Sequence, residues 1–133
     1  MADPDPAWVF ADAWVLAAIG GYARPCSLRE VIGAADWINH AILLASEVEP
    51  ALGKLAHAGL VRVLDDWTFE LTDEGLEVWS EGAGHDLLGR VVALQEQLSA
   101  FEPGTAMVRL PQGAMERAVE EYLRPPGRDS GRD

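Results

Sequence analysis

Few side chains in this sequence have the types and spacing that metal binding or nucleophilic catalysis requires. The three histidines, His40, His57 and His85, lie far apart and lack the i, i+4 or Cys-x-x-Cys spacing of a metal site. Cys26 has no neighbouring motif for a nucleophile, so we expect a small buried thiol there. The sequence therefore predicts neither a metal site nor a cofactor.

The motifs of the common enzyme classes are also missing. The sequence contains no GxGxxG, no P-loop and no GxSxG pattern. The carboxylate pairs Asp65-Asp66 and Glu120-Glu121 are expected in a turn and on a polar helix face. Solvated surface is the simpler interpretation for both pairs, because glycosidase chemistry would need a cleft around them. We expect a protein that is not an enzyme.

Five tryptophans in 133 residues is a high number. Trp8 and Trp14 belong to the first predicted helix, and Trp37, Trp67 and Trp79 are spread along the next part of the chain. One interpretation is that they pack in the core and in an interface. The other is that they line a small-molecule pocket. Trp67, where the second strand of a predicted hairpin begins, is the candidate for an exposed position.

Length and composition indicate one domain with a real core. The chain has 133 residues, is 49% hydrophobic and carries a formal net charge of −12. Such a charge repels phosphate at long range. No apolar run reaches the roughly 18 residues of a membrane span, and the acidic residues 1–6 do not resemble a signal peptide. With its single cysteine, the chain is expected to be a soluble cytoplasmic protein.

The local signals predict a mainly α fold with a small β-hairpin. Asp5-Pro6 is a helix-start signal, and the helix that follows is apolar around most of its circumference, so it must be central or also covered by a partner chain. Ser27 and Glu30 form a capping-box pattern, and Ser46 is the expected N-cap of a third helix. Within residues 1–81 we expect helices at 7–19, 27–39 and 46–58, strands at 60–64 and 67–71, and a helix that begins at Thr72.

Residues 82–124 are expected to form a helical extension, followed by a flexible tail at 125–133. A long helix at 85–101 precedes a short strand at 106–110 and a last helix that begins at Pro111. Apolar residues of the long helix recur at alternating spacings of 4 and 3, a short heptad seam. This seam and the first helix predict a homodimer, with an interface formed by Trp8, Leu87, Val91, Leu94, Leu98 and Phe101.

Two short segments resemble motifs of a known family. The segment 56–61, Ala-His-Ala-Gly-Leu-Val, resembles the end of the recognition helix in winged helix-turn-helix regulators of the MarR and PadR type. The segment 69–75, Phe-Glu-Leu-Thr-Asp-Glu-Gly, resembles the exit from their wing. With the capping box, the match covers residues 8–79. The stretch 31–42 also resembles small uncharacterised bacterial winged-helix proteins. The resemblance implies a winged helix-turn-helix domain in residues 1–81.

The resemblance further implies a DNA-binding transcriptional regulator. In that family the third helix enters the major groove and the hairpin lies beside it. Carried over to this sequence, the DNA contacts come from Lys54 and His57 on the third helix, Arg62 on the hairpin, and Arg29.

The charges of the same segment support an alternative. Residues 8–79 contain four Arg or Lys and eleven Asp or Glu, a net charge of −7. The predicted hairpin tip carries Asp65 and Asp66, where the family usually has basic residues. A typical specific binder neutralises roughly 6–10 phosphates. The alternative is therefore a winged-helix interaction module that does not bind DNA and whose partner protein is basic or apolar.

Overall fold

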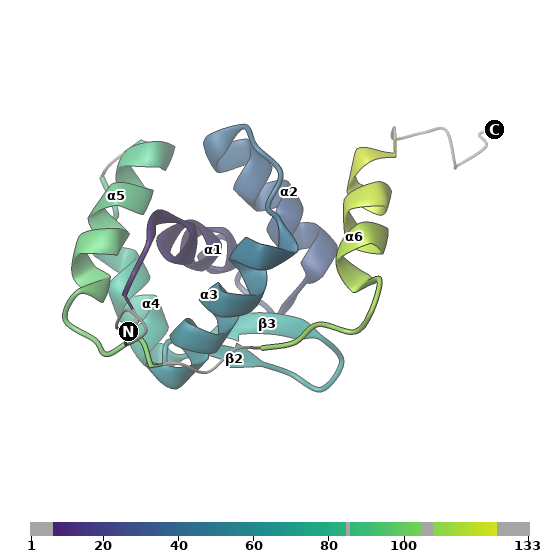
Figure 1. Ribbon diagram of the computed structural model, residues 1–133. Coiled ribbons are helices and arrows are strands. Elements are labelled where there is room, and N and C mark those ends of the chain that lie inside the picture. The colour runs from purple at the N-terminus through teal and green to yellow at the C-terminus, as the bar shows by residue number, and fades with distance from the viewer. Residues whose placement is uncertain (1–6, 85, 105–107, 125–133) are drawn as a thin grey trace, which may run out of the picture.

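The computed structural model describes residues 7–84, 86–104 and 108–124, and these residues form six helices and one small sheet (Figure 1). The expected start of the first helix directly after Asp5-Pro6 was wrong, because residues 7–9 are not helical and α1 begins at Phe10 with Val9 as its N-cap. The expected tail at 125–133 lies outside the described residues. The elements in chain order are α1 (Phe10–Gly20), β1 (Cys26–Ser27), α2 (Leu28–Asn39), α3 (Ala45–His57), β2 (Val61–Val63), β3 (Thr68–Leu71), α4 (Asp73–Ser80), α5 (Leu87–Leu98) and α6 (Ala114–Leu123).

The sheet has three antiparallel strands in the order β1-β3-β2. The expected hairpin is present: Arg62 of β2 lies opposite Glu70 of β3, and Val63 lies opposite Phe69. The two-residue strand β1 was not predicted, because it exists only through its pairing with β3, in which Cys26 lies opposite Phe69. The side chain of Phe69 is fully buried, so the sheet contributes directly to the core.

Helix α1 lies in the middle of the helices, with α2, α3 and α5 around it (Figure 1). Every residue from Asp12 to Ile19 is buried. The sequence left open whether this helix is central or also covered by a partner chain, and within this single chain it is central. None of the helices in the described ranges has the length and apolar character that crossing a bilayer requires.

Side chains fix several helix ends as expected. Ser27 and Glu30 form the predicted capping box at α2, and Thr72 accepts the backbone N–H of Gly75 at the start of α4. The prediction of Ser46 as N-cap of α3 was wrong. The helix begins after Leu44, whose backbone N–H donates to the carboxylate of Glu47 at 2.9 Å.

Two glycines determine the backbone next to the hairpin, Gly59 at the end of α3 and Gly75 in α4. Gly59 has φ of 79° after the last turn of α3, and the Leu60 N–H reaches the Leu55 carbonyl at 3.0 Å, a Schellman ending. Gly75 packs so closely on the carbonyl of Leu60 that a Cβ atom would collide with this backbone oxygen. The motif around residues 69–75 therefore serves the contact between α4 and the end of α3.

The C-terminal part of the chain packs onto the helices rather than apart from them. Helix α5 lies against α1, and α6 lies against α2 (Figure 1). Met115 and Ala118 of α6 are buried, and the Tyr122 hydroxyl donates to Asp36 of α2 at 2.7 Å. The expected strand at 106–110 is not formed in its described part, since residues 108–110 have no regular structure.

Candidate functional site

Lys54 does not face outward from α3, contrary to the expectation from the sequence. Its ammonium group lies 2.7 Å from the carboxylate of Asp12 in α1 and donates to the Ala7 carbonyl at 3.0 Å. It also lies 6.0 Å from the centre of the Trp8 ring. The side chains of Lys54 and Asp12 are only 13% and 1% exposed. The cation expected at the centre of a DNA-contact surface is thus part of an internal ion pair.

The other three predicted DNA contacts are exposed but do not form one free basic patch. Arg62 bonds Glu70 of the neighbouring strand at 2.9 Å. Arg29 lines a hollow of about 430 Å³ that also includes Asp66, Trp67 and Arg117, and none of the other three candidates lines it. His57 lies at the last turn of α3. Each of the four predicted DNA-contact residues therefore has different neighbours, and the four do not form one surface.

The described residues Gly104, Val108 and Leu110, from the connection between α5 and α6, lie against α3. The N–H groups of Val108 and Leu110 donate to the backbone carbonyl and the carboxylate of Glu49, at 3.3 and 2.9 Å. At the other end of α3, Gly104 approaches the His57 ring so closely that a Cβ atom would overlap it. Gly53 is buried, although it lies opposite the core side of the helix. The face that would enter a major groove is therefore partly covered, although His57 itself is exposed.

The hairpin tip is acidic and tightly organised. Asp65 and Asp66 are exposed, and the Asp66 carboxylate accepts the backbone N–H and the hydroxyl of Thr68, at 3.2 and 2.6 Å. Trp67 adopts a φ of 59°, which is rare for a bulky residue. Its side chain is half-buried against the core rather than exposed.

Two of the five tryptophans line an open hollow, which we call the aromatic groove. It has a volume of about 500 Å³, lies between α1, α2, α4 and α5, and is lined by Tyr22, Trp37, Trp79, Arg90 and small residues of α1 and α2. Arg90 lies over the Trp79 ring, 4.0 Å from its centre, and the Trp79 indole donates to the Ala17 carbonyl at 3.3 Å.

The remaining tryptophans do not line the aromatic groove. Trp14 is buried and donates to the Ala35 carbonyl at 2.8 Å, and Trp8 donates to the Phe101 carbonyl at 2.9 Å. The packing interpretation is thus confirmed for Trp14, and the small-molecule interpretation stays a prediction for Trp37 and Trp79, which line the aromatic groove. Sequence reasoning missed Arg90, which no local pattern relates to Trp79.

The heptad seam of α5 is buried inside the single chain. Val91, Leu94 and Leu98 are 0% exposed, because they pack with α1 in the core. Leu87, by contrast, is 45% exposed. The surplus of apolar faces that motivated the expected dimer interface is therefore largely used within one chain.

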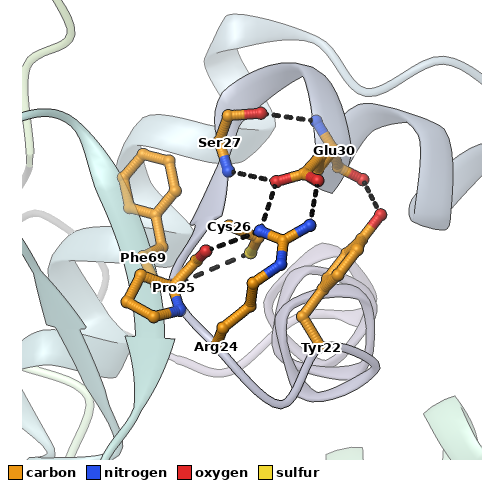
Figure 2. A network of polar contacts seen from close by, with 7 residues as sticks. All are labelled: Tyr22, Arg24, Pro25, Cys26, Ser27, Glu30 and Phe69. Atoms are coloured by element: carbon orange, nitrogen blue, oxygen red, sulfur yellow. Dashed lines mark hydrogen bonds and ion pairs between the residues drawn. The ribbon is translucent and has the colours of Figure 1, made fainter.

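A polar network joins β1 to the start of α2 (Figure 2). Glu30 accepts from the Ser27 N–H at 2.9 Å and from the Arg24 guanidinium, and the Tyr22 hydroxyl donates to the Glu30 backbone carbonyl at 3.2 Å. The Arg24 hydrogen bond and the Ser27 N–H lower the pKa of Glu30 to about 2. The Cys26 thiol is buried behind this network, as expected, and burial raises its pKa to about 12.

The Cys26 thiol is not a reactive nucleophile at neutral pH, because the thiolate is the reactive form.

Among the residues that the structure describes, no group of three or more His, Cys, Asp or Glu side chains is placed to hold a metal ion. The expected helix start at His85 lies outside the described residues, and the N-cap of α5 is Asp86.

The ion pair between Asp12 and Lys54 should be worth far more than the exposed pair between Arg62 and Glu70. Lys54→Met leaves a buried carboxylate without its cation, so the free energy of unfolding should fall by about 3–5 kcal/mol. Asp12→Asn combined with Lys54→Met should recover part of that loss. Arg62→Met is the matched control and should cost under about 1 kcal/mol. Urea unfolding measures all four proteins, and equal effects of the two single Met variants would contradict a structural role for Lys54.

Glu30 should make the folded state acid-sensitive. Its pKa is lowered from 4.5 to about 2, so its contribution to stability is complete above pH 4.5 and is lost as the pH falls toward 2. Glu30→Gln should lower the free energy of unfolding at pH 7, and the difference from the natural chain should shrink at pH 3. Urea unfolding at both pH values checks this. A difference that stays constant with pH would mean that the carboxylate charge does not stabilise the network.

Comparisons with known proteins assign neither a family nor a function to this chain. The chain matches no family model, and neither the search of curated proteins nor that of solved structures finds a match.

Proposed function

We propose that this chain is a winged helix-turn-helix domain with a helical extension. The support is the order of elements, α1-β1-α2-α3-β2-β3, together with a three-stranded sheet in the order β1-β3-β2. In a winged helix, α2 and α3 form the helix-turn-helix and the β2–β3 hairpin is the wing. The close packing of Gly75 on Leu60 gives a physical reason for the family-like motif at residues 69–75.

Within that fold, we infer that the chain is a protein-interaction module that does not read DNA through α3. The observation that carries this inference is the buried contact between Lys54 and Asp12. A regulator of the expected type would use Lys54 as a cation directed at phosphate, and reaching phosphate from here would leave the Asp12 carboxylate buried without its partner. Such separation of a buried pair is costly, typically about 3–5 kcal/mol.

The covering of α3 supports the same inference. Leu110 is bonded to Glu49, and Gly104 lies against His57, so the chain itself occupies part of the side of α3 that would meet a base pair. A helix enters the major groove only when its outer side chains are free to reach base edges. DNA binding through α3 would therefore require this segment to move away.

The charges on the described surface indicate what kind of partner the module takes. Asp65, Asp73, Glu74 and Glu77, from the hairpin tip and α4, are all exposed. Arg24 and Arg62 are each paired with a glutamate of the same chain. A partner with a basic surface is attracted to such a face, and this attraction speeds association and weakens with salt.

The second candidate function is the DNA-binding transcriptional regulator. The order of the elements favours it, and Arg29 and His57 are exposed. In either case we propose a non-enzymatic, cytoplasmic protein.

A selection with random genomic DNA fragments separates the two candidates. At about 50 mM salt, where phosphate contacts are strong, the natural chain should enrich no reproducible sequence. Asp65→Lys at the hairpin tip and Glu116→Lys on α6 change the charge equally, and both should raise DNA binding to the same small extent. A reproducible site, strengthened by Asp65→Lys more than by Glu116→Lys, would overturn the interaction-module proposal.

The acidic face should control recognition of the protein partner. Glu74→Gln with Glu77→Gln removes two exposed charges from α4 without touching the core, so a partner recovered with the natural chain should associate more slowly with this variant. Glu116→Gln with Glu120→Gln on α6 is the matched control and should leave association unchanged. Surface plasmon resonance at low and high salt measures both rates. Equal association rates for the two variants, or rates independent of salt, would contradict a basic partner at this face.

A further inference from the structure

Exposed apolar side chains gather at one place, where α2 ends and α5 begins. Trp37 is 73% exposed, Leu87 and Leu88 are 45% exposed, and Val92 is 51% exposed. We call these four residues the α2–α5 patch. The other large exposed apolar side chains of the described residues are scattered over other elements: Val9, Leu44, Leu76 and Leu123. A contiguous group of this kind on a folded protein marks an interaction surface.

The patch contains a protrusion and a recess side by side. Trp37 projects between the aromatic groove, of about 500 Å³, and a second hollow of about 340 Å³ formed with His40, Asp86 and Leu88. Trp37, Ile38 and Leu87 line both hollows. In Figure 1 the end of α2 and the start of α5 lie at the same end of the molecule. Leu88 and Val92 are four residues apart on α5, so they extend the apolar surface along one face of that helix.

The charges near the patch do not oppose a second copy of the chain. The whole chain carries a net charge of −12, which repels a like molecule in general. The two hollows, however, are lined by one cation, Arg90, and one carboxylate, Asp86, with His40 as the remaining titratable side chain besides the Tyr22 phenol. Two copies that meet here bring few like charges together, and each brings one charge of either sign.

We propose that a second copy of this chain occupies the α2–α5 patch in a two-fold arrangement, with Trp37 of each copy in the aromatic groove of the other. A two-fold interface must be complementary to itself, so the same patch has to supply both the protrusion and the recess. Tryptophan and arginine are the side chains that most often dominate interface energetics. This dimer uses the exposed part of α5, not the buried seam, and it does not depend on the proposed function.

The test is the dissociation constant of the dimer, measured by sedimentation equilibrium. Trp37→Glu and Leu88→Glu should each raise it at least about thirtyfold, which corresponds to the roughly 2 kcal/mol or more that defines a hot-spot residue. Leu44→Glu and Leu76→Glu place the same charge at similarly exposed apolar positions outside the patch and should leave it unchanged. All four side chains are exposed, so circular dichroism should show the natural helix content in each variant.

Fluorescence tests the arrangement of the dimer. The difference between the natural chain and Trp37→Phe isolates the emission of Trp37, which iodide should quench only after dilution has dissociated the dimer. A natural chain that stays monomeric up to about 100 µM, a concentration at which even weak specific dimers form, would overturn the proposal. So would a dimer that Trp37→Glu and Leu88→Glu leave intact, or a dimer in which iodide quenches Trp37 freely.

Discussion

The apolar character of α1 on every side is the constraint on which the rest of this structure depends. A helix with one apolar stripe needs one neighbour, but a helix that is apolar all round must be enclosed. Residues 13–19 are each 3% exposed or less. Helices α2, α3 and α5 each pack on α1, and β3 also contacts it. The extension at the C-terminal end is thus part of the core, because without α5 one side of α1 would face water.

The single carboxylate in that buried helix has consequences for function. Asp12 accepts the Val9 N–H at the start of α1 and is then left with a charge that needs a cation. Lys54 of α3 supplies it, because α3 packs directly on α1. A requirement of the core thereby removes a cation from the outer surface of α3. This link between packing and surface charge is the main support for our proposal of a protein partner rather than DNA.

Local patterns predicted what is determined locally. The capping box of Ser27 and Glu30, the cap at Thr72 and the hairpin each depend on residues a few positions apart, and each was predicted from the sequence. Strand β1 was missed because its partner, Phe69, is 43 residues away from Cys26. Helical periodicity likewise indicated that the α5 seam is buried, but the sequence prediction assigned it to a dimer interface, whereas α1 of the same chain covers Val91, Leu94 and Leu98. The candidate site was less predictable for the same reason. Asp12 is a charged residue between Phe10 and Trp14 in an otherwise apolar run. Because the helix is enclosed, its carboxylate needs a partner with the opposite charge. The side chain of Lys54 lies on the α1 side of α3 because it is that partner.

The two inferred surfaces follow from what the core leaves uncovered. Enclosing α1 uses the inward faces of α2, α3 and α5, and Gly104 and Leu110 then cover part of the outer face of α3. What stays exposed is acidic on the hairpin tip and α4, and apolar where α2 ends and α5 begins. These two surfaces differ in chemistry, so one can take a basic protein while the other takes a second copy of the chain. Under the proposed function, the chain keeps the element order of a winged helix, while the surfaces that it leaves exposed suit proteins.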